Sequence, residues 1–168
     1  MNPGTHDAAI LAEKLALLLT RREKTLALAE SCTGGLMAHL FTALAGSSAY
    51  FRLSAVTYAN DTKEKVLGVR RETLHAHGAV SEAVAREMAV GARRVGMADF
   101  GLSTTGIAGP SGGTETKPVG MVCIGLCTAQ SLQSWCLIRD TGERKANQRL
   151  FAALALERLY HFMLEESS

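Results

Sequence analysis

The chain has 168 residues, of which 47% are apolar and 20% are charged, and its formal net charge is +2. This length and composition suit one folded domain with a substantial core, and they exclude a disordered chain. No lysine or arginine cluster exceeds what a solvated helix face carries, which argues against nucleic-acid binding. No apolar run approaches the roughly 20 residues of a membrane-spanning helix, so we expect no membrane association.

The N-terminal residues and the cysteines indicate the compartment. Residues 1–7 lack the basic and apolar regions of a secretory signal, so we expect a cytoplasmic protein with reduced thiols. No CxxC pair and no histidine pair with zinc spacing is present, so no metal site is predicted. Cys123 and Cys127 share one face of a strand-like run and are predicted to be core residues. The other two cysteines are Cys32 and Cys136.

Hydrophobic spacing, caps and turn residues predict helices and strands that alternate along the chain. Asp7 can cap the first helix, which ends in the basic turn 21–24 and has an apolar stripe formed by Ala8, Leu11, Leu15 and Leu18. The predicted elements that follow are a strand over 25–29, a helix over 34–45, a strand over 50–58, short helices over 62–67 and 71–77, a helix capped by Ser81, a strand over 99–104, a hairpin of 119–128 with 132–139, and a helix over 143–164.

The sequence also predicts one turn and the apolar faces of two helices. Asn60-Asp61 is predicted to be a turn. The helix capped by Ser81 is predicted to bury the face formed by Val84, Met88, Ala92 and Val95. The final helix has an apolar stripe that either packs internally or meets a second copy of the chain, formed by Ala152, Leu156, Leu159, Tyr160 and Met163.

Early helix–strand alternation followed by a late hairpin is typical of an α/β protein. We therefore predict a three-layer α/β/α sandwich with a mixed sheet, which forms a single domain over residues 1–168. The pattern leaves the strand order open. It also leaves the oligomeric state open, including a homo-oligomer.

Three polar segments follow predicted strands, where ligands of α/β sheets gather. They are ESCTGG (30–35), TYANDTKEK (57–65) and TTGIAGPSGG (104–113). Gly34 and Gly35 open a helix whose N–H groups could hold an anion, and Gly106 could let the backbone wrap a ligand; turn geometry alone is the alternative. Neither a nucleoside-triphosphate loop nor a dinucleotide fingerprint fits these glycines. Together the segments predict a pocket.

The sequence offers several nucleophiles and one plausible base. Candidate nucleophiles are Ser31, Cys32, Thr33, Ser47, Ser48 and Thr105. Lys63 lies just beyond a predicted strand and could act as a base if burial or a nearby arginine lowered its pKa; a solvated lysine is the alternative.

The segments AESCTGG, AGSSAYF, VTYANDTKEKVLGV, HGAVSE and TGIAGPSGGTETKPVG together resemble the C-terminal domain of the CinA family over about residues 5–160. The resemblance implies a nicotinamide-nucleotide amidohydrolase, which converts nicotinamide mononucleotide to nicotinate mononucleotide and ammonia. It implies a serine–lysine dyad and neither metal nor cofactor.

The resemblance also implies site residues. Ser48, the second serine of GSS, corresponds to the nucleophile, Lys63 to its base, and Tyr58 to a tyrosine of the catalytic site. Ser31 and Thr105 correspond to polar residues near the reacting amide. Thr33, Gly34, Gly35 and Gly106 are predicted to line the substrate pocket. Arg144 stands in Gly142-Glu143-Arg144, where the family has GDR, and could hold the substrate phosphate.

Two alternatives to this enzyme remain. One is a module that binds a pyridine nucleotide with little or no turnover. The other is a small amidase that uses the same dyad on a different amide.

Overall fold

The computed structural model of the protein, which describes residues 7–166, contains a five-stranded mixed sheet in the order β2-β1-β3-β4-β5. The strands are β1 (Leu26–Glu30), β2 (Phe51–Val56), β3 (Phe100–Gly106), β4 (Met121–Cys127) and β5 (Leu132–Ile138). β1 runs parallel to both β2 and β3, while β4 and β5 are antiparallel additions. The late hairpin therefore extends a parallel core, as the alternation predicted.

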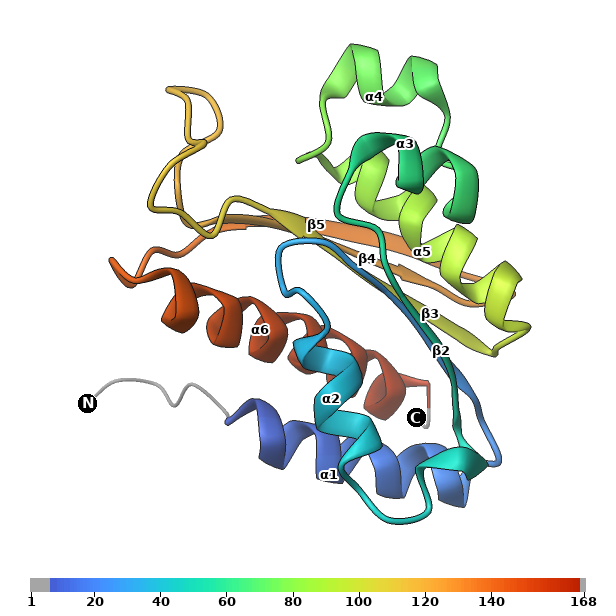
Figure 1. The fold of residues 1–168 in the computed structure, drawn as a ribbon. Helices are drawn as coiled ribbons and strands as arrows, with labels where there is room; N and C mark the ends of the chain where they lie inside the picture. The colour runs from blue at the N-terminus through green and yellow to red at the C-terminus, as the bar shows by residue number, and fades with distance from the viewer. Residues whose placement is uncertain (1–6, 167–168) are drawn as a thin grey trace.

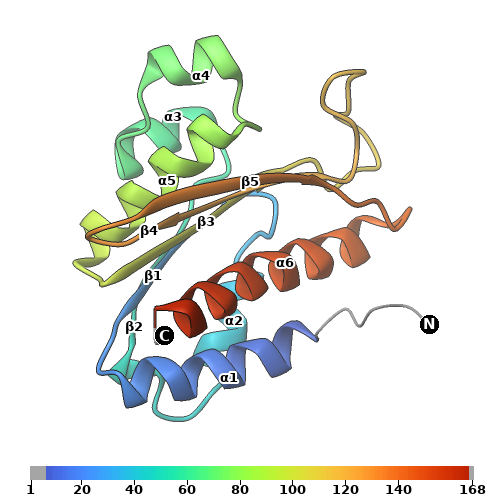
Figure 2. The same cartoon turned by 180° about the vertical axis from the view of Figure 1, so that it is seen from behind.

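Helices cover both faces of this sheet (Figures 1 and 2). One face carries α1 (Ala8–Arg21), α2 (Leu36–Thr42) and α6 (Arg144–Glu165). The other carries α3 (Asn60–Thr62), the π-helical turn η2 (Lys63–Leu67), α4 (Arg71–His77) and α5 (Glu82–Gly96), and a 3₁₀ turn, η1 (Ser47–Ala49), leads into β2. The predicted three-layer α/β/α sandwich is confirmed. None of the described helices is both long and apolar enough to cross a bilayer.

Two hydrophobic clusters, one on each face of the sheet, form the core. The stripe of α6 belongs to the first, since Ala152, Leu156, Leu159 and Met163 are buried against α1 and the sheet. The stripe therefore packs internally. On the other face, Val84, Met88 and Ala92 of α5 are buried as predicted. Val95 was predicted wrongly, since 42% of it is exposed near the end of the helix.

Two further predictions are wrong. Asn60-Asp61 begins a helix instead of forming a turn, because α3 continues directly into η2. The four thiols are not all reduced, because Cys123 and Cys136 face each other across β4 and β5 and form a disulfide. Cys123 is nevertheless buried as predicted, and Cys32 and Cys127 are free and buried.

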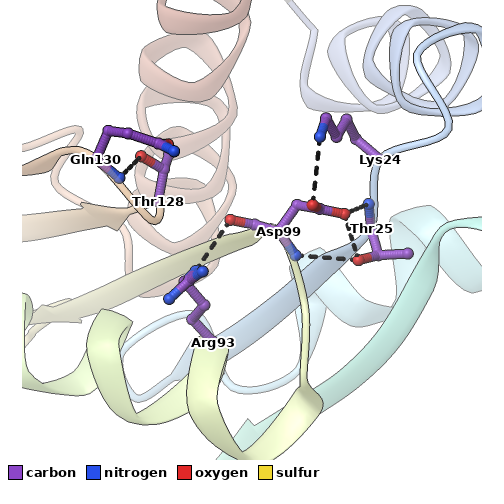
Figure 3. Close-up of polar contacts among 6 residues, drawn as sticks. All are labelled: Lys24, Thr25, Arg93, Asp99, Thr128 and Gln130. Atoms are coloured by element: carbon purple, nitrogen blue, oxygen red, sulfur yellow. Dashed lines mark hydrogen bonds and ion pairs between the residues drawn. The ribbon is translucent and has the colours of Figure 1, made fainter.

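At the amino-terminal ends of β1 and β3, Asp99 organises a polar network (Figure 3). Its carboxylate accepts hydrogen bonds from the Thr25 N–H at 2.9 Å and the Thr25 hydroxyl at 2.8 Å, and it forms an ion pair with Lys24 at 3.4 Å. The Asp99 N–H donates to the Thr25 hydroxyl, and Arg93 donates to the Asp99 carbonyl. This end of the sheet is therefore closed by one ion pair and several hydrogen bonds.

Candidate functional site

At the opposite, carboxyl end of the sheet, a lysine and a serine meet. Ser31 follows β1 directly, and Lys63 opens the π-helical turn that follows the neighbouring parallel strand β2. The Lys63 Nζ atom lies 3.2 Å from the Ser31 Oγ atom. It also donates to the backbone carbonyls of Thr57 at 2.8 Å and Tyr58 at 3.2 Å. Since parallel strands end at the same edge, the topology brings these two loops together.

Lys63 is only 1% exposed, and no carboxylate forms an ion pair with it within residues 7–166. Burial lowers the pKa of Lys63 below its ordinary value of 10.5, while a charged Cys32 would oppose that shift. Burial raises the pKa of the Cys32 thiol to about 12, so that thiol is neutral at pH 7. A neutral amine can donate to both carbonyls and keep its lone pair for the Ser31 hydroxyl proton. The geometry thus suits a general base.

Ser48, the predicted nucleophile, does not lie beside Lys63. It is an exposed residue of η1, which precedes β2, whereas Lys63 follows that strand. The six residues of β2 span about 20 Å, so the two side chains lie at opposite ends of the sheet. The predicted pairing of Ser48 with Lys63 is therefore wrong, and Ser31 takes that place.

The buried carboxylate of Glu30 holds the loop that carries Ser31. Its two oxygens accept hydrogen bonds from donors in β2, the loop and α2, namely Ser54 Oγ, Thr33 Oγ1 and the N–H groups of Gly35, Met37 and Ala38. The N–H groups at the start of α2 are thus occupied by Glu30. The predicted anion site at this helix start is therefore wrong, although Gly34 and Gly35 do adopt positive φ there.

Within residues 7–166, none of the remaining predicted side chains forms a hydrogen bond with the side chain of Lys63 or Ser31. The Tyr58 side chain is 61% exposed, and its hydroxyl accepts a hydrogen bond from Arg144 at 2.8 Å. Arg144 also donates to the Gly109 carbonyl at 2.7 Å, which ties α6 to the loop after β3. The Thr105 hydroxyl donates to the Ala79 carbonyl. The Thr33 hydroxyl contacts Glu30 and thus serves the loop.

A pocket of about 200 Å³ lies beside these residues. Its walls come from the loop after β1, the end of β2, the loop after β3 and the start of α6, through residues that include Cys32, Tyr58, Gly106, Ile107 and Arg144. A Cβ atom on Gly106 would lie 2.5 Å from the Met121 carbonyl oxygen and 3.1 Å from the Cys32 sulfur, so only glycine fits there. The predicted convergence of the three polar segments is confirmed.

Two residues that position Lys63 and Ser31 were not predicted as site residues. One is Glu30, whose place at the end of an apolar strand was the available signal. The other is Gly91 of α5, where a Cβ atom would lie 2.1 Å from the Leu67 carbonyl oxygen. This close approach seats η2 on α5, and no local sequence signal marks it. No group of three or more metal-binding side chains occurs within residues 7–166.

Comparison with known proteins identifies the family. The sequence matches the model of the CinA C-terminal domain over residues 8–163. The chain belongs to the CinA family. A CinA-like protein of Desulfosudis oleivorans is 53% identical over 159 residues, which cover 94% of this chain and 38% of that protein. This CinA-family chain thus spans well under half the length of such curated relatives.

Solved CinA-family structures share the fold. The competence/damage inducible protein CihA from Agrobacterium tumefaciens superposes with a TM-score of 0.89 at 38% identity, covering 96% of this chain and 97% of that one. A CinA superfamily protein from Escherichia coli superposes with a TM-score of 0.89 at 29% identity, covering 96% and 93%. The α/β architecture described above is therefore that of the CinA family.

Proposed function

We propose that this CinA-family protein is an amidohydrolase that removes the carboxamide of nicotinamide mononucleotide. The observation that carries the proposal is the contact of the buried Lys63 amine with the Ser31 hydroxyl at 3.2 Å. A serine needs a neighbouring base to lose its proton during attack, and a buried amine without a carboxylate partner can be such a base. The family resemblance supplies the substrate.

The reaction proceeds in two halves. In the first, the Ser31 oxygen bonds to the carboxamide carbon while its proton moves to Lys63, and the C–N bond then breaks as Lys63 returns the proton to the departing ammonia. In the second, water attacks the resulting ester, its proton passes through Lys63 to the Ser31 oxygen, and nicotinate mononucleotide leaves. The N–H groups of Cys32 and Thr33, next in the chain after Ser31, are the nearest candidates to stabilise the oxyanion.

The pocket that is lined by Cys32, the residue after Ser31, suits a flat ring. Tyr58 and Ile107 supply apolar surface to its walls, and the volume of about 200 Å³ is small, as a single pyridine ring requires. The Tyr58 ring face would favour the positive charge of a pyridinium. Tyr58 thus contributes to ring binding here, since its hydroxyl points to Arg144 and not to Ser31 or Lys63.

Ammonia release from nicotinamide mononucleotide tests the proposal. Wild-type protein should release ammonia, and Ser31→Ala should reduce the rate at least about 10³-fold, because the nucleophile is lost. Ser48→Ala is the matched control and should keep the wild-type rate, since Ser48 is exposed at the far end of β2. Release that persists in Ser31→Ala would contradict the dyad. Tight nucleotide binding without ammonia from the wild type would identify a binding module instead.

A further inference from the structure

A second groove, of about 370 Å³, adjoins the site between α2 and the first turns of α6. The backbone of residues 33–35 forms one side of it. The side chains of His39, Lys145, Gln148 and Arg149 form much of the rest. No acidic residue lines this groove, so an anion is the ligand that its charge favours.

The cations at this groove are not placed for the stability of α6. This helix begins with Arg144-Lys145 and has no acidic residue in its first turn, where the helix dipole disfavours positive charge. By contrast, α5 has the favourable arrangement, with Glu82 in its first turn and Arg93-Arg94 in its last. Within residues 7–166, neither Lys145 nor Arg149 forms an ion pair. Their charges therefore remain available to a ligand.

Neighbouring contacts fix the groove relative to Ser31. The Gln148 side chain donates to the Cys32 carbonyl at 3.0 Å and thereby ties α6 to the loop that carries Ser31. Arg144 cannot serve the groove freely, because its guanidinium already donates to Tyr58 and Gly109. The start of α2 offers no free donors either, because Glu30 occupies them. The side chains of Lys145 and Arg149 are thus the groove's anion-binding groups.

We propose that this groove binds the phosphate monoester of the substrate, with Lys145 and Arg149 as the charged contacts and His39 at its edge. The assignment rests on the proposed function, because it places the phosphate at one end of a ligand whose amide reaches Ser31. It replaces the expectation that Arg144 or the start of α2 holds the phosphate. Free inorganic phosphate has the same chemistry and is a second possible occupant.

Calorimetric titration of nicotinate mononucleotide and of nicotinate riboside, which lacks the phosphate, tests the groove. The variant Lys145→Gln/Arg149→Gln should bind the mononucleotide about tenfold or more weaker, because it loses charge-assisted hydrogen bonds to the phosphate. Nicotinate riboside should bind the double variant and the wild type with the same affinity. Arg86→Gln, which removes an exposed arginine of α5 on the other face of the sheet, is the matched control and should change neither affinity.

The outcomes separate this proposal from the amidohydrolase. The groove assignment would be overturned if the double variant kept its affinity for the mononucleotide, or if it lost affinity for the riboside equally. It would also be overturned if the wild type did not bind the mononucleotide. A selective loss together with no ammonia release by the wild type would leave the groove assigned and reject the enzyme. Inorganic phosphate should displace the mononucleotide only at much higher concentration; displacement at equal concentration would indicate a free-phosphate site instead.

Discussion

Lys24 and Lys63 stand at opposite ends of the same sheet and have opposite surroundings. The Lys24 side chain is 48% exposed and forms an ion pair with the Asp99 carboxylate, within a network of hydrogen bonds (Figure 3). Lys63 is 1% exposed and contacts two carbonyls and a hydroxyl. The amino-terminal end of the sheet thus stabilises the fold, whereas the carboxyl end retains an uncompensated amine that the fold alone does not need.

Replacing each lysine by methionine should give the largest difference between the two ends of the sheet. Lys63→Met should lower ammonia release about 10³-fold, because the general base is lost. Its free energy of unfolding should change by no more than about 1 kcal/mol, since lost hydrogen bonds and relieved desolvation offset each other. Lys24→Met should leave the rate unchanged. Ammonia assays and urea denaturation of both variants measure these effects, and equal rates in the two variants would refute the assigned base.

The buried carboxylate of Glu30 should matter more for stability than the exposed carboxylate of Glu143. Glu30→Gln should lower the free energy of unfolding by about 2–3 kcal/mol. The reason is that an amide nitrogen would face N–H groups whose hydrogen bonds a carboxylate oxygen now accepts. Glu143→Gln, an exposed residue that makes no side-chain cap of α6, is the matched control and should be neutral. Urea denaturation of both variants measures these changes. An unchanged free energy of unfolding in Glu30→Gln would show that the loop does not depend on this carboxylate.

The pH dependence of ammonia release and of stability should reflect the burial of Lys63. The pKa of Lys63 lies below 10.5, so kcat/KM for ammonia release should rise with pH as Lys63 loses its proton, with a midpoint below that value. Between the lowered pKa of Lys63 in the folded state and its ordinary value of 10.5 in the unfolded state, the unfolded state binds more protons. The Lys63 contribution to the free energy of unfolding therefore also rises with pH in this range. Lys63→Met should lack this rise in stability. A rate that falls across this range would contradict a neutral lysine base.

The smallest effect is expected at Asp99. Burial pushes the pKa of this carboxyl upward, but hydrogen bonds from Thr25 and the charge of Lys24 outweigh it, so the pKa lies below 3.8. Its stabilising contribution is therefore present above pH 3.8 and disappears as pH falls through the lower folded value. Asp99→Asn should lose less stability than wild type on acidification. Thermal unfolding between pH 2 and pH 5 compares them, and parallel curves would contradict this assignment.

Most of the fold could be predicted from local patterns. The three-layer architecture follows from alternating helices and strands, and α4 has the predicted bounds. The predictions failed where long-range contacts decide: Val95 lies in the last turn of α5 and is exposed although Gly96 beside it packs on β1, and the pairing of Cys123 with Cys136 depends on the register of β4 and β5. Register is a property of two strands together, which the periodicity of either strand does not reveal.

The site was predictable in part for a similar reason. Lys63 and the three converging segments follow from where strands end. The choice of Ser48 over Ser31 relied on the resemblance, although the chain order held the necessary signal: Ser48 precedes β2, and Lys63 follows it. Ser31 ends the neighbouring strand, so parallel pairing of β1 with β2 brings it to Lys63. That pairing could not be predicted while the strand order was open.

The π-helical turn from Lys63 to Leu67 makes the site sensitive to chain length. Both of its end residues are buried, Lys63 toward Ser31 and Leu67 against α5. Inserting one residue between them would lengthen the helical segment by one residue and rotate one end relative to the other by roughly 100°. A single-codon insertion in this segment would thus separate the Lys63 amine from the Ser31 hydroxyl while leaving the sheet intact.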